Sequence, residues 1–489
     1  MKKLLTILFI LVIPMAAFAG GQQEVTASDD AAEKIANAKY VLLFIGDGMA
    51  MPQINAAEAY LNSKAGTSPG VKKLSFTQMP AQGLTTTYSS NSFITDSAAA
   101  GTAIACGQKT ESGVISMDAT KTKVLPTIAE MAKAAGMRVG IVSSVDVDHA
   151  TPAVFYSHNQ SRNNYYEIGL DMADSDFDYF GGGLIKISKT PEGEKTAIEV
   201  MKDNGWTIAT TREELNALQP GQQAYAYYDT SFTTNSLDYA MDQNDEDISL
   251  AEYTKKGIEL LDNEKGFFMM VEGGKIDWAC HANDAAASIH NTIAFDKAVE
   301  EGIKFYNAHP NETIVIVTGD HETGGLTLGF AGTKYDSAFT EIDNQKMSYE
   351  AFDKYVLAPY KESSEGRGKL SELMPEIEEA FGLTELTDYE MEMLEGAFAR
   401  SIGNETERAS ETQEYLLYGG YEPLTVTITH ILNQRAGLAW TSYSHTGVPV
   451  QTFALGIGQE MFNGYYDNTD IFKYMKTIMF AEEKLAMAQ

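Results

Sequence analysis

The sequence predicts an α/β fold, a three-layer sandwich in which helices flank both faces of a largely parallel central sheet. Two observations support this prediction. Short continuous apolar runs recur along the 489-residue chain, and segments with helical periodicity lie between them. Such runs are typical of strands buried on both faces, and their alternation with helices is typical of a parallel sheet. Because 44% of the residues are hydrophobic, the chain can bury a large core, and we expect one long α/β domain.

The predicted elements follow one another in a regular order. Strands are predicted at residues 40–45, 139–142, 267–271, 313–317 and 450–455, and helices at residues 52–61, 125–135 and 283–307. Ligands of open parallel sheets bind beyond the carboxyl ends of the strands. Polar residues follow four of these strands, namely Asp47, then His149 with Thr151, then Glu272, and finally Asp320 with His321. We therefore expect a functional site at this edge.

The segment of residues 332–429 differs in character from the rest of the chain. It lacks strand-like apolar runs, its charge rises, and helical patterns recur at residues 370–381 and 389–398. We interpret it as a mostly helical, crown-like or lid-like insertion in a domain that spans residues 38–489. The insertion either covers the active edge of the sheet or takes part in a subunit contact.

The N-terminus predicts export from the cytoplasm. Lys2 and Lys3 precede an apolar run at residues 4–13, and small residues at 17–19 form a cleavage site, so residues 1–19 are predicted to be a signal peptide. An uncleaved membrane anchor is the alternative, but the run is short for a membrane span. Residues 20–37 are polar and are expected to form a flexible linker. We expect a periplasmic or secreted protein with no membrane span after signal removal.

The net charge argues against nucleic-acid binding as the main role, and the cysteine content argues against a fold held together by disulfides. The chain has 68 acidic and 36 basic residues, a net charge of −32, which repels nucleic acid and favours cation binding wherever carboxylates converge. Its two cysteines, Cys106 and Cys280, are too few for a disulfide framework, and one bridge between them is not favoured because buried free cysteine is common. Cys280 lies within a suspected metal motif, but we do not expect it to be a ligand.

The run TDSAAAGTA at residues 95–103 predicts a helix capped by Thr95 or Asp96, with Ser97 in the first turn. The N-terminus of a helix favours negative charge, such as a bound anion or a serine that becomes an alkoxide. Taken alone, the run is more typical of an ordinary capped core helix. The acidic and histidine residues elsewhere in the chain change this interpretation.

Three further motifs carry the residue types that bind metals. Asp277 and His281 would lie on one face if a helix begins nearby, because they are four residues apart. Asp320 and His321 are adjacent in a glycine-rich turn after a buried strand. His445 precedes the last predicted strand, so three of the eight histidines in the chain fall at these motifs.

Together these residues resemble the alkaline phosphatase family in order and spacing. The matching motifs are GDGM at 46–49, TDSAA at 95–99, ATP at 150–152, SR at 161–162, DYFGGG at 178–183, Glu272 with Asp277 and His281, Asp320 with His321, and HTG at 445–447. The resemblance covers residues 38–330 and 436–458, and the insertion shows little of it. It implies hydrolysis of small phosphate monoesters through a phosphoserine, in a homodimer.

The resemblance also implies two Zn²⁺ ions, one Mg²⁺ ion and a role for each matching residue. One zinc would be held by Asp277, His281 and His445, and the other by Asp47, Asp320 and His321. The magnesium would be held by Asp47, Thr151 and Glu272. The catalytic residues would be Ser97 as nucleophile and Arg162 as phosphate clamp, with Asp96 orienting the arginine. Cations are needed because a phosphate monoester dianion resists attack by an anion.

Two positions differ from part of the family. His149 stands where some members carry Asp beside the magnesium, so the third site could hold Zn²⁺ or Co²⁺ instead; a non-ligand histidine is an equal alternative. Trp278 stands where some members carry Lys near the phosphate. It could contact the substrate or line the pocket, although packing in the core is the simpler interpretation.

Two other functions remain open at this stage. A phosphodiesterase of the same superfamily is the nearest alternative, although diesterases resemble this pattern with Thr as nucleophile and without the third metal site. Ser97, Arg162 and Glu272 together favour a monoesterase. A secreted protein that binds metal or phosphate without turnover is the second alternative, but no expected ligand is missing.

Overall fold

The computed structural model describes residues 37–228, 235–403 and 410–480. The predicted signal peptide at residues 1–19, and residues 20–36 of the predicted linker at 20–37, lie outside the described residues. None of the described helices is long and apolar enough to cross a membrane.

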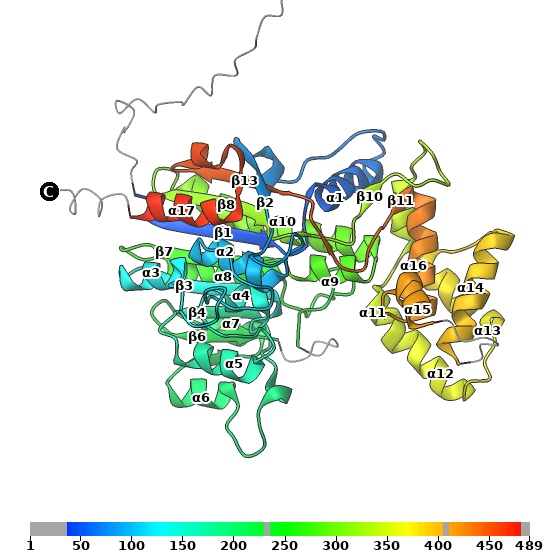
Figure 1. Ribbon diagram of the computed structural model, residues 1–489, viewed down its shortest axis with the longest axis horizontal. Helices are drawn as coiled ribbons and strands as arrows, with labels where there is room; N and C mark the ends of the chain where they lie inside the picture. The colour runs from blue at the N-terminus through cyan, green and yellow to red at the C-terminus, as the bar shows by residue number, and fades with distance from the viewer. Residues whose placement is uncertain (1–36, 229–234, 404–409, 481–489) are drawn as a thin grey trace, which may run out of the picture. The chain divides into compact units, whose positions relative to one another are not determined.

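In the part of the chain that the structure describes, ten strands form the central sheet. Their order is β14 (Gly464–Asp467), β2 (Ala81–Thr86), β13 (Val450–Gly456), β8 (Thr313–Gly319), β1 (Tyr40–Gly46), β7 (Phe267–Glu272), β3 (Arg138–Asp146), β4 (Tyr179–Gly183), β6 (Ala224–Tyr227) and β5 (Thr207–Ala209). β13 is antiparallel to both of its neighbours, and the remaining pairs are parallel. The expected largely parallel sheet is confirmed (Figure 1).

Helices cover both faces of the sheet, as the three-layer prediction requires. One face packs on α2 (Ser97–Cys106), α3 (Ile128–Ala134), α4 (Ala150–Ala153), α5 (Tyr165–Asp174), α6 (Ala197–Asp203) and α17 (Asn468–Met479). The other packs on α1 (Met51–Lys64), α7 (Arg212–Ala217), α8 (Leu250–Leu261), α9 (Lys275–His281) and α10 (Ala285–Ala308). Alternate residues of β1 enter the two cores, Val41 and Leu43 on one side and Leu42 and Phe44 on the other. This explains why the strand is apolar throughout.

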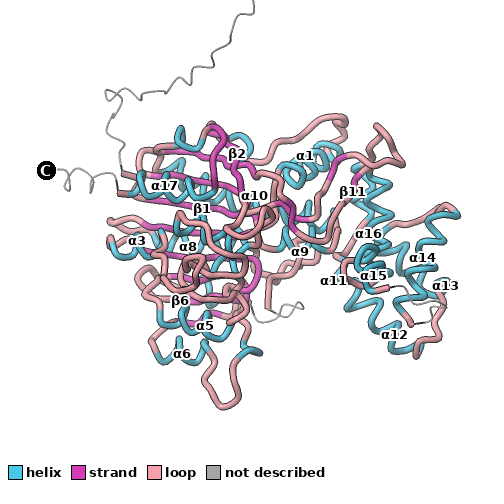
Figure 2. Tube along the Cα trace, in the orientation of Figure 1, coloured by secondary structure: helices cyan, strands magenta, loops and turns pink. Residues whose placement is uncertain are grey.

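The insertion is built from helices with a hydrophobic core of their own. Its helices are α11 (Tyr349–Phe352), α12 (Ala358–Ser364), α13 (Leu370–Phe381), α14 (Asp388–Ser401), α15 (Glu411–Tyr418) and α16 (Pro423–Ala436). Figure 2 shows these helices and their loops without a strand among the described residues of the insertion. The predicted boundary at residue 429 falls inside α16. That helix continues to Ala436, which packs in the core of the sheet.

Two short antiparallel pairs attach the last part of the chain to the edge of the sheet. β9 (Glu322–Thr323) pairs with β12 (His445–Thr446), and β10 (Thr327–Leu328) pairs with β11 (Leu438–Ala439). In the first pair, His445 lies opposite Thr323. A histidine that is distant in sequence is thereby placed beside the loop that follows β8.

The two cysteines lie on opposite faces of the sheet as buried free thiols. Burial raises the pKa of the Cys106 thiol to about 12. Cys280 contacts Ser288 and Gln53 through its sulfur atom. Both side chains therefore serve as small core residues in this fold.

Candidate active site

Three side chains converge where β1 and β8 end. Asp47 follows β1, and Asp320 and His321 follow β8; all three are fully buried. The Nε2 atom of His321 lies 3.3 Å from Asp47 Oδ1 and 3.3 Å from Asp320 Oδ2. Neither of these carboxylate oxygens accepts a hydrogen bond. Two buried oxygens without donors facing an imidazole nitrogen form a donor set that suits a divalent cation.

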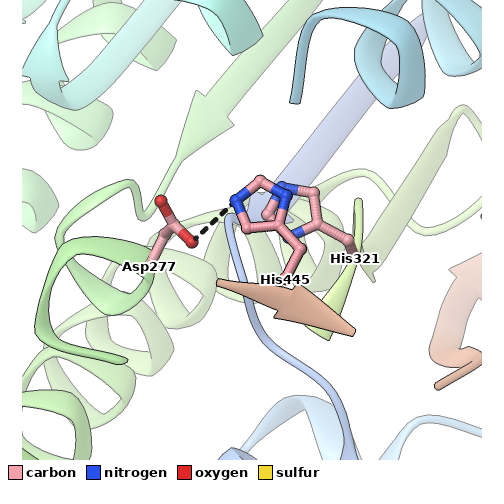
Figure 3. A group of neighbouring side chains, drawn as sticks. All are labelled: Asp277, His321 and His445. Carbon is pink, nitrogen blue, oxygen red and sulfur yellow. Dashed lines mark ion pairs between the residues drawn. The ribbon is translucent and has the colours of Figure 1, made fainter. Parts of the chain in front are cut away.

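A second group lies beside the first. Asp277 and His281 are on α9, and their side chains approach to 3.3 Å, as the predicted spacing of four residues requires. His445 Nε2 lies 3.1 Å from His281 Nε2 and 3.7 Å from Asp277 Oδ1. In Figure 3 the Asp277 carboxylate faces the ring of His445, which stacks on the ring of His321 at 3.6 Å between centroids.

Backbone carbonyls fix the orientation of the two histidines in this second group. His281 Nδ1 lies 2.6 Å from the Tyr443 carbonyl, and His445 Nδ1 lies 2.8 Å from the Thr95 carbonyl. A carbonyl can only accept, so each Nδ1 carries a proton, which leaves Nε2 as the nitrogen that can bind a metal once it is deprotonated. Metal-binding histidines commonly use this arrangement.

A third group contains Asp47, His149 and Glu272, all of them buried. Thr151 Oγ1 lies 3.4 Å from Asp47 Oδ2, while Ser143 Oγ donates a hydrogen bond to Glu272. Oε1 of Glu272 and Nδ1 of His149 have no hydrogen-bond partner. The residues expected to hold the third metal are therefore neighbours.

His149 can contact either the Arg162 guanidinium or a metal ion, but not both through the same tautomer. Its Nε2 lies 3.0 Å from the Arg162 guanidinium, which can only donate, so this contact places the imidazole proton on Nδ1. Burial, with Arg162 as the next contribution, lowers the pKa of His149 well below its ordinary value and keeps the ring neutral. Because Nδ1 would have to lose its proton to bind a metal, His149 cannot be a ligand and also accept from Arg162.

Ser97 begins α2, and Asp96 is the cap of that helix. Asp96 Oδ1 accepts from the Ala99 backbone N–H at 3.0 Å, while Oδ2 lies 3.0 Å from Arg162 and 3.0 Å from the Gly113 backbone nitrogen. Ser97 Oγ lies 3.1 Å from His321 Nε2. The predicted capped helix is confirmed, and its cap also holds the arginine.

One cavity of about 320 Å³ opens onto the second of these groups and onto Ser97 and Arg162. It is lined by Ser97, His149, Arg162, Asp277, Trp278, His281, Tyr349, Tyr421 and His445. Tyr349 and Tyr421 come from the insertion. The other seven residues come from α2, α9, β12 and the loops on either side of α4. Trp278 is half-buried, and its ring lies edge-on to His149 with centroids 5.9 Å apart.

The carboxyl groups at this site carry an electrostatic cost that cations would offset. Burial raises the pKa of Asp47, and the neighbouring Asp320 raises it further. Burial also raises the pKa of Asp320 and brings that of Glu272 to about 7. Burial opposes ionisation of Asp277 too, but the nearby His281 outweighs it and the pKa of Asp277 is well below its ordinary value. Cations placed among these groups would stabilise their ionised forms.

Several supporting residues were not predicted. Thr323 Oγ1 donates to Asp277 Oδ1 at 2.5 Å and lies 3.2 Å from His321 Nδ1, so it contacts both of the first two groups. Glu322 accepts from Gln53 at 2.8 Å and from the Thr446 hydroxyl, next to His445. The position of Thr323 two residues after His321 was a usable signal, since hydroxyls often orient ligands. Nothing in the sequence marks Gln53.

Comparison with known proteins identifies the family. The model of the alkaline phosphatase family matches residues 38–481. The chain is 31% identical to alkaline phosphatase 4 and 30% identical to alkaline phosphatase 3 of Bacillus subtilis, with 97% and 96% of both chains covered in the respective comparisons.

Solved structures agree with this result. The cold-active alkaline phosphatase from Shewanella sp. is 29% identical with a TM-score of 0.75, over 90% of this chain and 99% of that one. A histidine-to-glutamate variant of the TAB5 alkaline phosphatase, solved with magnesium in its M3 site, is 25% identical with a TM-score of 0.62, over 91% of this chain and 99% of that one. The chain therefore belongs to the alkaline phosphatase family of hydrolases.

Proposed function

We propose that this alkaline phosphatase hydrolyses small phosphate monoesters through a phosphoserine intermediate formed on Ser97. Metal-dependent hydrolysis of phosphate monoesters is the general activity of the family. The observation that carries the specific proposal is the shared cavity, which Ser97 and Arg162 line together with Asp277, His281 and His445. A nucleophile, an anion clamp and cation ligands are the three requirements of phosphoryl transfer.

The proposed cofactors are two Zn²⁺ ions and one Mg²⁺ ion. Asp277, His281 and His445 would hold one zinc ion; Asp47, Asp320 and His321 would hold the other. Asp47, Thr151 and Glu272 would hold magnesium, with Zn²⁺ or Co²⁺ as alternatives if His149 gives up its contact with Arg162. When bound, the cations supply positive charge that offsets the charge of the phosphate and favours the ionised serine.

The residues of the chain bind and orient the phosphate. Arg162 presents two N–H groups to two phosphate oxygens, and Asp96 fixes the plane of the guanidinium through its hydrogen bond at 3.0 Å. Burial opposes the charge of Arg162, but Asp96 outweighs this and raises the pKa of the guanidinium, so it stays charged. Negative charge on Ser97 is stabilised at the N-terminus of α2.

The reaction would proceed in two displacements at phosphorus. Ser97 Oγ gives up its proton and forms a bond to phosphorus while the bond to the ester oxygen breaks, and the leaving oxygen takes up a proton to become the alcohol. Water then attacks the phosphoserine, which releases inorganic phosphate and restores the Ser97 hydroxyl. Arg162 would donate hydrogen bonds to the same phosphate oxygens in both steps.

We also propose that the mature enzyme acts in the periplasm or outside the cell as a homodimer. The signal-peptide pattern of residues 1–19 supports export. The net charge of −32 supports small phosphate esters rather than nucleic acid as substrates. Cell fractionation tests the location, and light scattering that gives the mass of one chain would overturn the dimer.

A comparison of substrates and metals tests the proposed reaction. The purified protein is expected to hydrolyse phenyl phosphate at alkaline pH, to lose activity with a chelator, and to recover it with Zn²⁺ plus Mg²⁺ or Co²⁺. Acid quenching during turnover is expected to trap one phosphoryl group on the peptide that contains Ser97. Faster hydrolysis of a phosphodiester would instead support the diesterase. Phosphate binding without turnover would support the binding protein.

A further inference from the structure

Part of the wall of the active-site cavity is aromatic. It consists of Trp278 on α9, Tyr349 at the start of α11, and Tyr421 shortly before α16. All three side chains are half-buried and line the cavity, so part of each ring remains exposed there. We call these three residues the aromatic wall. None of them is a suitable metal ligand or a charged contact for phosphate.

Neighbouring groups hold the tyrosine rings in fixed positions. The Tyr349 hydroxyl lies 3.1 Å from that of Tyr239, and the Tyr349 backbone N–H donates to Asp284 at 2.9 Å. The Tyr421 ring meets that of Tyr349 edge-on, with centroids 5.7 Å apart and an interplanar angle of 87°. A ring already fixed in this way loses little conformational entropy when a ligand packs on it.

A buried lysine connects the tryptophan to the insertion. Lys275 Nζ lies 4.9 Å from the Trp278 ring centroid and 3.8 Å from that of Tyr239, and it pairs with Glu350 at 3.4 Å. Lys275 is on α9 with Trp278, whereas Glu350 follows Tyr349 on α11. The charged pair and the cation–π contacts therefore fix the two sides of the aromatic wall relative to each other.

We propose that the aromatic wall is a subsite for a planar aromatic group on the leaving alcohol, which makes aryl and nucleoside monoesters the favoured substrate class. The inference rests on the proposed function, because it assumes a phosphate bound between Ser97 and Arg162. A leaving group attached to that phosphate lies in or beside the same cavity of about 320 Å³, which the three rings line. Exposed ring surfaces favour stacked or edge-on aromatic partners over saturated groups of the same size.

Matched inhibitors test this subsite without the effect of leaving-group chemistry. Benzylphosphonate and cyclohexylmethylphosphonate have similar size and charge, but only the first contains a planar aromatic ring. We expect the wild-type enzyme to bind the planar compound about three- to tenfold more tightly, as measured by competitive inhibition of phenyl phosphate hydrolysis. Tyr421→Leu should reduce the ratio towards unity, and Tyr421→Phe should retain it.

A control variant and a second pair of compounds complete the experiment. Tyr389→Leu changes an exposed tyrosine of α14 in the same insertion and should leave the ratio unchanged. Both adenosine 5′-monophosphate and ribose 5-phosphate have the ribose 5-oxygen as leaving oxygen, so their ratio of kcat/KM reports whether a nucleobase uses the subsite. A preference in this pair that Tyr421→Leu removes assigns nucleosides as substrates, and a preference only in the first pair assigns aryl esters.

The possible failures can be told apart. Absence of phenyl phosphate hydrolysis would reject the proposed function itself. Normal hydrolysis with equal binding of both phosphonates by the wild-type enzyme would reject only the aromatic subsite. A preference that survives in Tyr421→Leu would likewise reject the assignment of Tyr421.

Discussion

The clustered carboxylates and histidines of the site, which we call the charged floor, and the aromatic wall are held in place by different parts of the molecule. Among the members of the charged floor, Asp47 follows β1, Glu272 ends β7, and Asp320 and His321 follow β8; these are three adjacent parallel strands with fully buried residues. Two of the three wall residues belong to the insertion, whose helices have a separate hydrophobic core. Half of the expected metal ligands are thus attached to the buried central strands. Two of the three residues expected to contact the leaving group are attached to the separate core of the insertion.

The largest expected effect concerns Ser97, which lies beside the charged floor. Ser97→Ala removes the proposed nucleophile, and kcat for phenyl phosphate should fall by about 10³-fold or more, because the proposed covalent intermediate forms on the Ser97 hydroxyl. The inhibition constant of inorganic phosphate should change much less, since Arg162 remains. Ser90→Ala, at an exposed serine before the same helix, should keep the wild-type rate. A Ser97→Ala enzyme with a rate near that of the wild type would remove Ser97 from the mechanism.

A core mutation in the insertion tests whether the two regions are independent. Phe381 is fully buried in the core of the insertion, and Phe381→Ala should cost about 3–5 kcal/mol of local stability. Hydrogen exchange should accelerate in α13, α14 and α16 but remain slow in β1 and β8. Phe268→Ala in β7 is the matched change in the core of the sheet and should accelerate exchange in the strands. Equal acceleration in both regions by either variant would contradict the comparison.

The Thr323 hydroxyl should contribute to metal affinity. Thr323→Val removes the donor to Asp277 and the contact with His321, and metal affinity should fall by about 10- to 100-fold. Chelator titration of the metal-loaded enzyme measures this effect. Thr323→Ser keeps the hydroxyl and should behave like the wild type. If the Val variant held its metal as tightly as the wild type, the hydrogen bond from Thr323 would not contribute to metal affinity.

The smallest expected effect concerns the pH dependence of the insertion. Burial raises the pKa of Asp353 to about 7, although Thr425 donates a hydrogen bond to it. Because this value exceeds that of the unfolded chain, the folded state binds the extra proton, and stability is lost as the pH rises from about 4 to 7. Asp353→Asn should therefore stabilise the insertion by about 1 kcal/mol at pH 8.5, and its advantage should vanish near pH 4. Urea unfolding at both values measures this; a benefit independent of pH would exclude ionisation as the cause.

The sequence predicted the centre of the sheet better than its edges. β1, β3, β7 and β8 are buried on both faces, which requires continuous apolar runs that are visible in the sequence. β2 has the sequence AQGLTT, and β5 has only three residues, so neither carries a recognisable pattern. Near the edge of the sheet, neighbouring elements rather than local composition determine whether such segments pair.

Site residues near strand ends could likewise be found, whereas their partners could not. Asp320 and His321 are adjacent in a glycine-rich turn, and Asp277 and His281 share one face of a helix, so local spacing was sufficient. His445 was associated with them only through the family resemblance, because more than a hundred residues separate it from each. The contact of Thr323 with Asp277 depends on how α9 packs against β9, which no local pattern encodes.

The sequence by itself determined the α/β class, the central strands and the capped helix that begins with Ser97, because these depend on apolar periodicity and local hydrogen bonding. Only the tertiary structure decided which side chains complete the cavity. Tyr349 and Tyr421 reach it from an insertion with its own core, and Arg162 is held by the cap of α2. Such contacts join residues far apart in the chain and follow from the packing of whole elements. At Ser97 the two sources meet, since local sequence starts its helix and the fold surrounds it with His321 and Arg162.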